Sequence, residues 1–562
     1  MSQPRVIDFF CGAGGFSEGF RQQGFDIVMG IDRWKPAMDT FNYNFGLEGK
    51  VRNMLDFDNI EAINELPDTE VILGSPPCVS FSSSNRSGTA DKSMGITLIE
   101  TFLRIIAVKK HQPGSVLKAW FMENVEKSRD HLRGQYTFGQ LGLGEWASQR
   151  GLHPRKIAIR LSGNSELLNS ADFGGAQLRK RLISGEIINA GKFIPPIKTH
   201  GSVENLKPYK TLGDVRARIP SPLGYQPEVL LQDPNYPSLR IPEQDLSDHF
   251  YDTGLYKAHW TKSWEQKMDH PYMGKMSFPE REDKPSRTIT ATKISSSREA
   301  LVFKSEYQRT GDGEFRSPTV REAATIMGFP ISYQFVGMES AKWRMVGNAV
   351  CPCVSGALAQ VLRAEQLMRK LSSPILGHYC CLKVPNLNNP LPLVFDNPPK
   401  RLKGGRFRKH AFKNGNITVT LSNYDILSGG TVGTKWVTSV QFGNGKGFPS
   451  LTFQDHYYRS METVLAQLST GPRFIEIINN GFSEKIASGP ELQAMYDEQV
   501  NGQEFLGPSA LIEHVAEIID GLGVGEQVET DAPSIFPHKE RVPQRQLLAL
   551  YAINKICSVA NH

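Results

Sequence analysis

The first 190 residues alternate short apolar runs with longer stretches of helical periodicity. The apolar runs have the length and composition of buried strands and occupy Arg5–Phe10, Asp26–Asp32, Glu70–Gly74 and Ala119–Val125. Residues 94–111 have the periodicity of a helix, whose apolar face carries Leu98, Ile99, Phe102, Leu103 and Ile106. Strands separated by helices form βαβ units. The sequence therefore predicts an α/β fold with a doubly wound, mixed or mostly parallel sheet.

This alternation stops near Ile194-Pro195-Pro196, and the chain up to about residue 315 is irregular and rich in Pro, aromatic and basic residues. Regular patterning resumes at Thr319–Gly328 and at Val350–Met368. Beyond residue 390 the pattern predicts an α+β region, with strands at 417–421, 435–442 and 451–453 and helices at 509–522 and 544–559. We predict four segments: a first domain over 1–190, an inserted domain over 191–315, a return to the first domain over 316–370, and a C-terminal region over 390–562.

The composition is typical of a soluble globular protein, because 39% hydrophobic and 22% charged residues exclude wholesale disorder. We find no run of about 18 apolar residues and no secretory h-region at the start, so we expect a cytoplasmic protein. Seven scattered cysteines do not suggest a disulfide framework. The net charge of +6 is compatible with an anionic partner without requiring one.

A glycine-rich turn over Asp8–Gly15 follows the first predicted strand, and Asp32 closes the second. Glycines at a strand-to-helix turn let a ligand approach the backbone, and a carboxylate at the next strand end can bind ribose hydroxyls. The spacing is not GxGxxG, so the dinucleotide fingerprint is not met. The alternative is a purely structural turn.

A second motif, Gly74–Ser82, presents Cys78 after two prolines that stiffen the chain. This cysteine is either a nucleophile, if nearby positive charge favours its thiolate, or a buried small hydrophobe. A third motif places Glu123 at the end of an apolar strand, where burial would raise the pKa of a proton donor; its alternative is helix capping. The basic block Gln177–Arg181 suits phosphate or base contacts, or is a solvated face.

In this order the motifs resemble those of the cytosine-C5 DNA methyltransferase family. The resemblance covers roughly residues 5–365, and six motifs in register are strong evidence. They are Asp8–Gly15, Pro76–Ser82, Glu123–Val125, Gln177–Arg181, Arg321–Pro330 and Gly347–Val350. The family implies the class I S-adenosylmethionine-dependent methyltransferase fold, with the inserted segment as its target-recognition domain.

The resemblance also implies a reaction. The Cys78 thiolate would add to C6 of a flipped-out cytosine while Glu123 protonates or hydrogen-bonds N3, and C5 would then take the methyl group of S-adenosylmethionine. Arg179 would help hold the cytosine and the Glu123 carboxylate, and Arg181 completes the predicted catalytic set. No metal is expected.

The remaining site residues are also carried over from the family. For the cofactor we expect Phe10 to stack on adenine, Asp32 to bind the ribose and Asp56 to accept from the adenine amino group. The other cofactor-binding residues predicted are Asp8, Gly12, Gly14, Gly15, Pro76, Asn348 and Val350. The DNA-binding residues predicted are Ser82, Gln177, Arg287, Thr288 and Thr290. One departure is Val79, where many relatives have Gln, and this puts the role of probing the gap left by the flipped base in doubt.

The leading prediction is therefore a prokaryotic or viral DNA methyltransferase that acts on double-stranded DNA in a restriction-modification or anti-phage system. An RNA methyltransferase and a non-catalytic DNA-binding protein are the alternatives. A recognition region of over a hundred residues favours duplex DNA, and the intact Cys78, Glu123 and Arg179 argue against a pure binder. The basic run within Lys400–Lys413 contacts DNA phosphates or is a solvated surface, and the C-terminal region alternatively docks another defence-system subunit.

Overall fold

The computed structural model describes residues 3–77, 93–246, 248–269, 274–307, 309, 314–365, 404–414, 417–424, 435–442, 450–498, 501–502, 504–525, 528–532, 535–536 and 541–562. Contacts divide the chain into two compact units. The described residues up to 365 belong to the first unit and those from 404 onward to the second, and each unit is described by itself.

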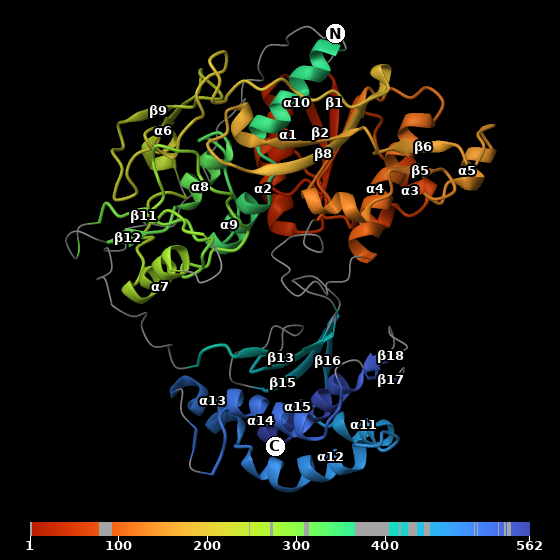
Figure 1. Ribbon diagram of the computed structural model, residues 1–562, viewed down its shortest axis with the longest axis vertical. Helices are drawn as coiled ribbons and strands as arrows, with labels where there is room; N and C mark the ends of the chain where they lie inside the picture. Colours follow the sequence, from red (N-terminus) through yellow and green to blue (C-terminus); the bar gives the residue numbers. More distant parts are fainter. Residues whose placement is uncertain are drawn as a thin grey trace. The chain divides into compact units, whose positions relative to one another are not determined.

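A six-stranded mixed sheet forms the centre of the first unit (Figure 1). Its strands are β1 (Arg5–Phe9), β2 (Asp26–Ile31), β3 (Val71–Gly74), β4 (Ala119–Asn124), β7 (Ser165–Asn169) and β8 (Lys180–Ile187), in the order β2-β1-β3-β4-β8-β7. The first four strands of this order are parallel, and β8 is antiparallel to both of its neighbours. The predicted α/β fold with a mixed sheet is confirmed.

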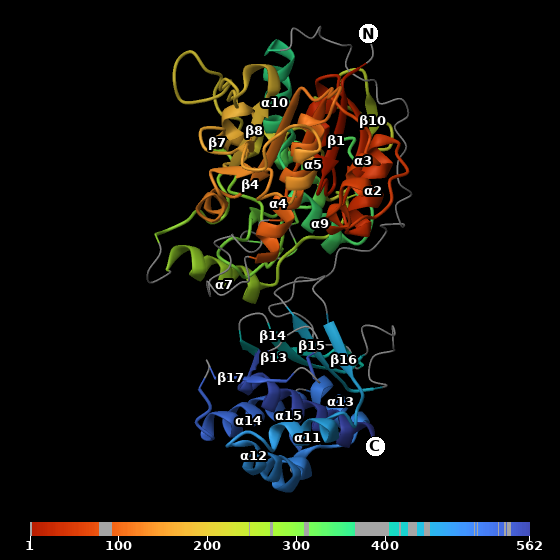
Figure 2. The same cartoon turned by 90° about the vertical axis from the view of Figure 1, so that its right-hand side faces the viewer.

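Helices cover both faces of this sheet, and the strands alternate their side chains between two buried clusters. On β4, Ala119 and Phe121 pack with α1 (Gly15–Gln22), α2 (Lys35–Phe45) and α10 (Pro352–Glu365). Trp120 and Met122 pack on the opposite face with α4 (Ser93–His111), which Figure 2 shows beside the strands. Burial on both faces explains why β4 is apolar along its length, and each such large side chain contributes about 2 kcal/mol.

The helix α10 lies along α1, so residues more than 300 positions apart complete one fold (Figure 1). Contact between the two helices is close because α1 carries Gly19. A Cβ at this position would lie 2.0 Å from Ser355 Oγ and 2.4 Å from Pro352 O. Ser355 Oγ in turn donates to Gly15 O over 3.2 Å. The chain thus returns to its first part, while the segment boundaries at 190, 315 and 370 stay predictions.

The inserted region between these parts has short elements, as its irregular sequence predicts. They are α6 (Leu212–Arg216), β9 (Leu230–Gln232), β10 (Arg240–Pro242), α7 (Lys257–Met268), β11 (Phe303–Lys304) and β12 (Phe315–Arg316). Two helices then lead back to α10, namely α8 (Val320–Met327) and α9 (Glu339–Asn348). A small apolar core with Ile241 and Phe250 at its centre also includes Ile331, which follows α8.

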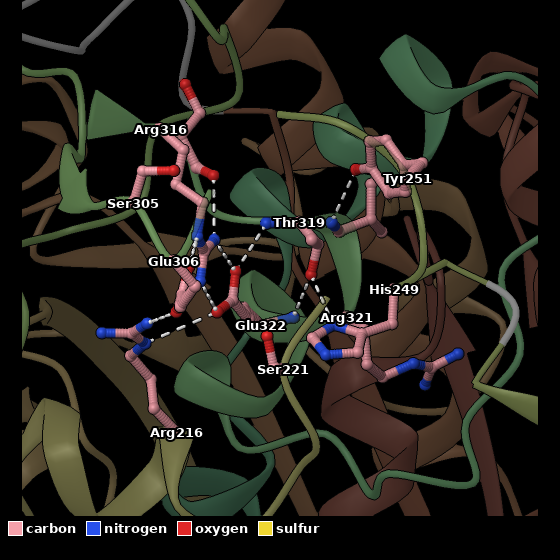
Figure 3. Close-up of polar contacts among 12 residues, drawn as sticks. Arg216, Ser221, His249, Tyr251, Ser305, Glu306, Arg316, Thr319, Arg321 and Glu322 are labelled. Atoms are coloured by element: carbon pink, nitrogen blue, oxygen red, sulfur yellow. Dashed lines mark hydrogen bonds and ion pairs between the residues drawn. The ribbon is translucent and has the colours of Figure 1, made fainter. Parts of the chain in front are cut away.

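Buried ion pairs and hydrogen bonds connect the inserted region to the start of α8 (Figure 3). Glu322 accepts two bonds of 2.7 Å from Arg316 and caps its own helix by accepting from the Thr319 amide at 2.8 Å. Arg216 adds a contact of 3.5 Å to the same carboxylate, and His249 bonds to the Thr319 hydroxyl at 2.9 Å. Burial alone would raise the pKa of Glu322, but the Arg316 bonds outweigh it and lower the pKa to about 2. Glu322 is therefore held charged inside the protein.

The second unit is an antiparallel sheet packed on helices. The strands follow one another as β13 (Arg408–Asn414), β14 (Ile417–Ser422), β15 (Val437–Phe442) and β16 (Ser450–Phe453). The helix α15 (Gln544–Asn561) packs on this sheet and on α11 (Tyr458–Leu465) and α14 (Pro508–Gly521). The strands and helices predicted here agree with the structure to within two residues at each end, and the α+β character of the region is confirmed.

The remaining elements are short. They are a 3-10 helix at Met54–Phe57, α3 (Ile60–Asn64), β5 (Gln135–Thr137), α5 (Gly144–Ser148), β6 (Ile157–Arg160), α12 (Gly471–Ile477), α13 (Gly489–Glu498), β17 (Glu529–Asp531) and β18 (Arg541–Pro543). Within the described chain no individual helix has the length and hydropathy to cross a membrane, and one bent pair, α9 with α10, meets that test by length and composition.

Candidate active site

Four predicted site residues lie where neighbouring parallel strands end. Phe10 follows β1, and Asp32 follows β2. Pro76 comes two residues after β3, and Glu123 is the penultimate residue of β4. Since the carboxyl ends of parallel strands share one edge of a sheet, the fold brings these residues to the same edge. This edge therefore carries residues from four strand ends that were predicted from the sequence to form the site.

The turn after β1 is open to a ligand at Gly12. Phe10 and Gly12 both have left-handed backbone, with φ of 55° and 54°, which a bulky residue rarely adopts outside functional sites. The Gly12 amide donates to Asp32 Oδ2 over 3.0 Å, and Asp32 Oδ1 accepts from the Trp34 amide at 2.8 Å. A Cβ at Gly12 would meet no atom within 4 Å, so a ligand can approach this backbone closely.

The next two glycines of the turn serve packing. A Cβ at Gly14 would lie 2.5 Å from the Phe45 ring, and one at Gly15 would lie 2.3 Å from Val350 O. Gly14 also has a φ of 89° at the start of α1. Close approach of protein atoms therefore explains why both positions are glycine, while the cofactor contacts of Gly14, Gly15 and Val350 stay predictions.

Asp8 is corrected from a cofactor-binding residue to a support of the turn. Its side chain has no exposed surface, so a ligand cannot touch it directly. Ser17 Oγ donates to Asp8 Oδ2 over 2.7 Å. Burial raises the pKa of Asp8 to about 7, against the bonds from Ser17. This carboxyl group is therefore close to half protonated at neutral pH.

Two further predicted cofactor residues have exposed side chains. Asp56 lies on the 3-10 helix Met54–Phe57, where its Oδ2 accepts from the Asn53 amide over 3.0 Å. Asn348 is the last residue of α9. Both side chains are accessible to a ligand, and their roles toward it stay predictions.

Glu123 is a buried carboxylate beside a cation. Its side chain is 9% exposed, and its Oε1 lies 3.0 Å from Arg181 Nε. Burial raises the pKa of Glu123, while the charges of Arg181 and Arg179 oppose the rise. A carboxyl group in this environment can hold or donate a proton more readily than one in water.

Arg181 makes a direct side-chain contact with Glu123, whereas the family resemblance implied that Arg179 helps hold this carboxylate. Arg179 is 3% exposed, and its guanidinium donates to three carbonyl oxygens at 3.0–3.1 Å, those of Ile289, Gly347 and Ala349. Arg179 thus joins the sheet to the inserted region at Ile289 and to the Gly347–Val350 motif, and influences Glu123 through its charge.

Asn124 was not singled out from the sequence, yet it contacts the segment that leads to Cys78. Asn124 Nδ2 donates to Pro76 O over 3.3 Å, and its Oδ1 accepts from the Val125 amide at 2.8 Å. Ser75 Oγ donates to Phe10 O over 2.9 Å, which ties the same segment to the glycine turn. The sequence signal was the amide side chain directly after the predicted acid.

Comparison with known proteins agrees with this geometry. Residues 4–364 match the C-5 cytosine-specific DNA methylase family. The chain belongs to that family. It is therefore a DNA (cytosine-5-)-methyltransferase, an enzyme that uses S-adenosylmethionine, and the prediction of this activity and methyl donor is confirmed.

Three relatives illustrate the extent of the similarity. The chain is 27% identical over 380 residues to the type II methyltransferase M.HgiDI of Herpetosiphon aurantiacus, covering 66% of this chain and 98% of the relative. It is 28% identical over 369 residues to M1.HphI of Haemophilus parahaemolyticus, covering 63% and 86%. M.HgiGI of Herpetosiphon aurantiacus is 35% identical over 127 residues, covering 22% and 93%. The family match ends at residue 364, before the described residues of the second unit, which start at 404.

Gln177 of this methyltransferase is corrected from a DNA-binding residue to a buried connector. It has no exposed surface. Its Oε1 accepts from the Ile289 amide over 2.7 Å, and its Nε2 lies 2.8 Å from Met327 Sδ. A fully buried amide whose polar atoms are bonded within the chain cannot reach a base.

Arg287 is held by contacts within the inserted region, although its side chain stays 24% exposed. Its guanidinium pairs with Glu280 and donates to Ala300 O and Arg298 O at 3.0 and 3.1 Å. Its contact with DNA stays a prediction. The neighbouring Thr288 and Thr290 are half-buried, and their hydroxyls donate to backbone carbonyls; their DNA contacts stay predictions.

Cys78 and Ser82 lie outside the described residues. The described chain reaches Pro77, and the contacts of Pro76 and Ser75 place this end of it at the edge that carries Glu123. Among the described residues no three His, Cys, Asp or Glu side chains gather as a metal site would require.

Of the basic run Lys400–Lys413, two described side chains have partners within the second unit. Lys409 Nζ lies 2.8 Å from Glu513 Oε1, and the Arg406 guanidinium stacks 4.6 Å from the centre of the Tyr424 ring. Residues 408–414 form β13, a strand that the sequence pattern did not predict. The contact of this run with DNA stays a prediction.

Proposed function

We propose that this methyltransferase modifies one cytosine within a defined duplex DNA sequence and is the modification enzyme of a type II restriction-modification system. The similarity to type II methyltransferases over almost their whole length supports this biological role. The observation that carries the site assignment is the buried Glu123–Arg181 pair beside the segment that leads to Cys78. In this proposal the enzyme works in the bacterial cytosol, where the DNA that it protects lies.

The proposed binding site for the methyl donor is the strand-end edge around Gly12. Its open backbone, the left-handed Phe10 and the half-buried Asp32 fit a nucleoside with a small chain attached. Phe10 would stack on the adenine, and Asp32 would hold the ribose. Asp56 would accept from the adenine amino group, and Asn348 would lie near the methionine portion. When bound, S-adenosylmethionine supplies an electrophilic methyl group.

The proposed chemistry needs a nucleophile and an acid on a ring that has left the duplex. The Cys78 thiolate forms a bond to C6 of the cytosine, and Glu123 gives a proton to N3, so that electron density collects at C5. After C5 is methylated, the C5 proton leaves and the Cys78–C6 bond breaks, which restores the aromatic ring. No metal takes part in these steps.

The protein's own contacts prepare this reaction. Arg181 orients the Glu123 carboxylate at 3.0 Å, and Asn124 holds Pro76 O so that the chain before Cys78 has a fixed direction. Arg179 and Gln177 hold the backbone around Ile289 against the sheet. The recognition segment is thereby fixed relative to the residue that protonates the target base.

Methyl transfer from labelled S-adenosylmethionine tests the proposal. Unmethylated duplex DNA and tRNA are offered separately to the wild type and to Cys78→Ala. We expect label on duplex DNA alone, dependent on Cys78, with bisulfite sequencing giving a single recurrent target. Label on tRNA would identify an RNA enzyme. Cofactor binding without labelling of either substrate would instead indicate a non-catalytic binder.

A further inference from the structure

An open cavity in the first unit is lined by residues other than those of the strand-end site. Its volume is about 260 Å³, room for several waters at ~30 Å³ each. It opens among the end of α1, the start of α10, the segment around α6 and the end of α8; Figure 1 shows α6 and α8 on the same side of α10. Its polar lining includes Gln22, Lys210, Arg218, Asn235 and Gln360.

Two cations line this cavity, and no lining residue is Asp or Glu. Lys210 is half-buried just before α6, and Arg218 is exposed just after it; among the described residues neither forms an ion pair. The exposed Asp214 of α6 acts on both through its charge, but its carboxylate accepts from the Thr211 amide over 2.8 Å and does not line the cavity. Arg216, on the same short helix, instead contacts the three carboxylates of Glu282, Glu306 and Glu322. The cavity wall therefore carries two cations whose charge is offset only in part, from outside the wall.

The local electrostatics agree with an excess of positive charge. Burial, together with the neighbouring charges of Arg218 and Lys207, lowers the pKa of Lys210, while Cys353 and Asp214 oppose this shift. The ring of His200 lies against Gly174 at the cavity wall. Burial and the charges of Lys210 and Lys207 lower the pKa of His200. A bound anion would relieve this repulsion.

The wall opposite the cations is the first turn of α10. The amides of Val354 and Ser355 donate to Cys351 O, at 2.9 and 3.2 Å, and the described structure gives the Cys353 amide no acceptor. Gly328 leaves this amide uncovered, because a Cβ there would lie 3.9 Å from Cys353 N. The start of a 14-residue helix adds a partial positive charge to the same cavity.

We propose that this cavity is a phosphate-binding site. Lys210 and Arg218 donate hydrogen bonds to the phosphate oxygens, and the first turn of α10 lies beside these oxygens. The phosphate belongs either to a free small metabolite or to the backbone of bound DNA. The site is separate from the residues that carry out methylation, so it stands whether or not the proposed reaction does.

Titration calorimetry of the full chain tests the first source. The ligand is inorganic phosphate in chloride buffer, with S-adenosylhomocysteine at saturation so that the strand-end site is filled. We expect binding to weaken about tenfold in Lys210→Gln and in Arg218→Gln, since each loses a charged bond. Lys210→Arg should retain binding. Lys192→Gln is the matched control, because Lys192 is exposed, does not line the cavity and is not among the charges that act on Lys210 or His200.

Duplex DNA binding at several salt concentrations tests the second source. If the phosphate is one of the DNA backbone, inorganic phosphate fails to bind measurably, while Lys210→Gln lowers the salt slope by about 0.9 and Lys192→Gln does not. Either pattern supports the site and names its source. The proposal is overturned if Lys210→Gln and Arg218→Gln match the wild type in both measurements, or if Lys192→Gln weakens binding as much as they do.

Discussion

Asn124 Nδ2 donates to Pro76 O across 3.3 Å, so the residue after Glu123 holds the chain two residues before Cys78. One strand end thus contributes the proposed acid and also a support for the segment that leads to the proposed nucleophile. In the proposed reaction the two groups act on the same pyrimidine ring, at N3 and C6, so a support shared by Glu123's strand and the segment at Pro76 bears on both.

Replacing Asn124 tests this support. In Asn124→Ala we expect the single-turnover rate of methylation to fall about 10- to 100-fold, because a small displacement of a reacting group is costly. Affinity for S-adenosylmethionine should change less than about twofold, since the turn at Gly12 is untouched. Asn59→Ala, which removes an exposed helix cap, is the control and should keep the wild-type rate. A large loss of cofactor affinity in Asn124→Ala would contradict this prediction, because it would show that the substitution disrupts the cofactor site as well.

Glu123→Gln tests the proposed acid. Removing a positioned proton donor lowers a rate by about 10²- to 10⁴-fold, and we expect a loss in this range in single-turnover methylation. The control is Glu186→Gln, because Glu186 is also buried in this sheet but pairs with Lys110 at 2.7 Å. Equal losses in both variants would show that any buried carboxylate of the sheet matters equally.

Arg181→Met tests how the acid is tuned. Burial raises the pKa of Glu123 and Arg181 opposes the rise, so removing Arg181 raises that pKa further. Because the protonated form donates to N3, the rate falls as pH rises through this pKa. The alkaline limb of the single-turnover pH profile should therefore move to higher pH in Arg181→Met, whatever happens to the maximal rate. An unmoved limb would assign that limb to another group.

Asp8→Asn tests the buried carboxyl group under the glycine turn. The folded pKa of about 7 lies above the ordinary value of 3.8, so the folded state retains a proton that the unfolded state loses. Its contribution to stability is present below about pH 4 and is lost as pH rises toward 7, by up to about 4 kcal/mol. Asp8→Asn should remove this fall in stability, as measured by hydrogen exchange of the β1 amides at several pH values. Asp39→Asn, at an exposed ion pair, should leave it in place.

The sequence predicted the elements whose signal is local. The face of α4 with Leu98 and Phe102 and the apolar runs of β1 to β4 follow directly from periodicity, and the glutamate at the end of β4 follows from its position. Burial by distant partners was not predictable. Gln177 is covered by a segment 112 residues away, and Arg287 meets a glutamate in a region without regular elements. The motif pattern identified both residues, but it could not distinguish a residue that reads DNA from one that holds the segment in place.

The proposed covalent step is tested most directly with a duplex that carries 5-fluorocytosine at the target identified by bisulfite sequencing. Fluorine at C5 cannot leave as the proton does, so the Cys78–C6 bond should persist after methyl transfer. We predict a denaturation-resistant adduct in the presence of S-adenosylmethionine, whose modified peptide contains Cys78 and which Cys78→Ala does not form. An adduct at another residue, or methylation of the normal duplex by Cys78→Ala, would contradict the account.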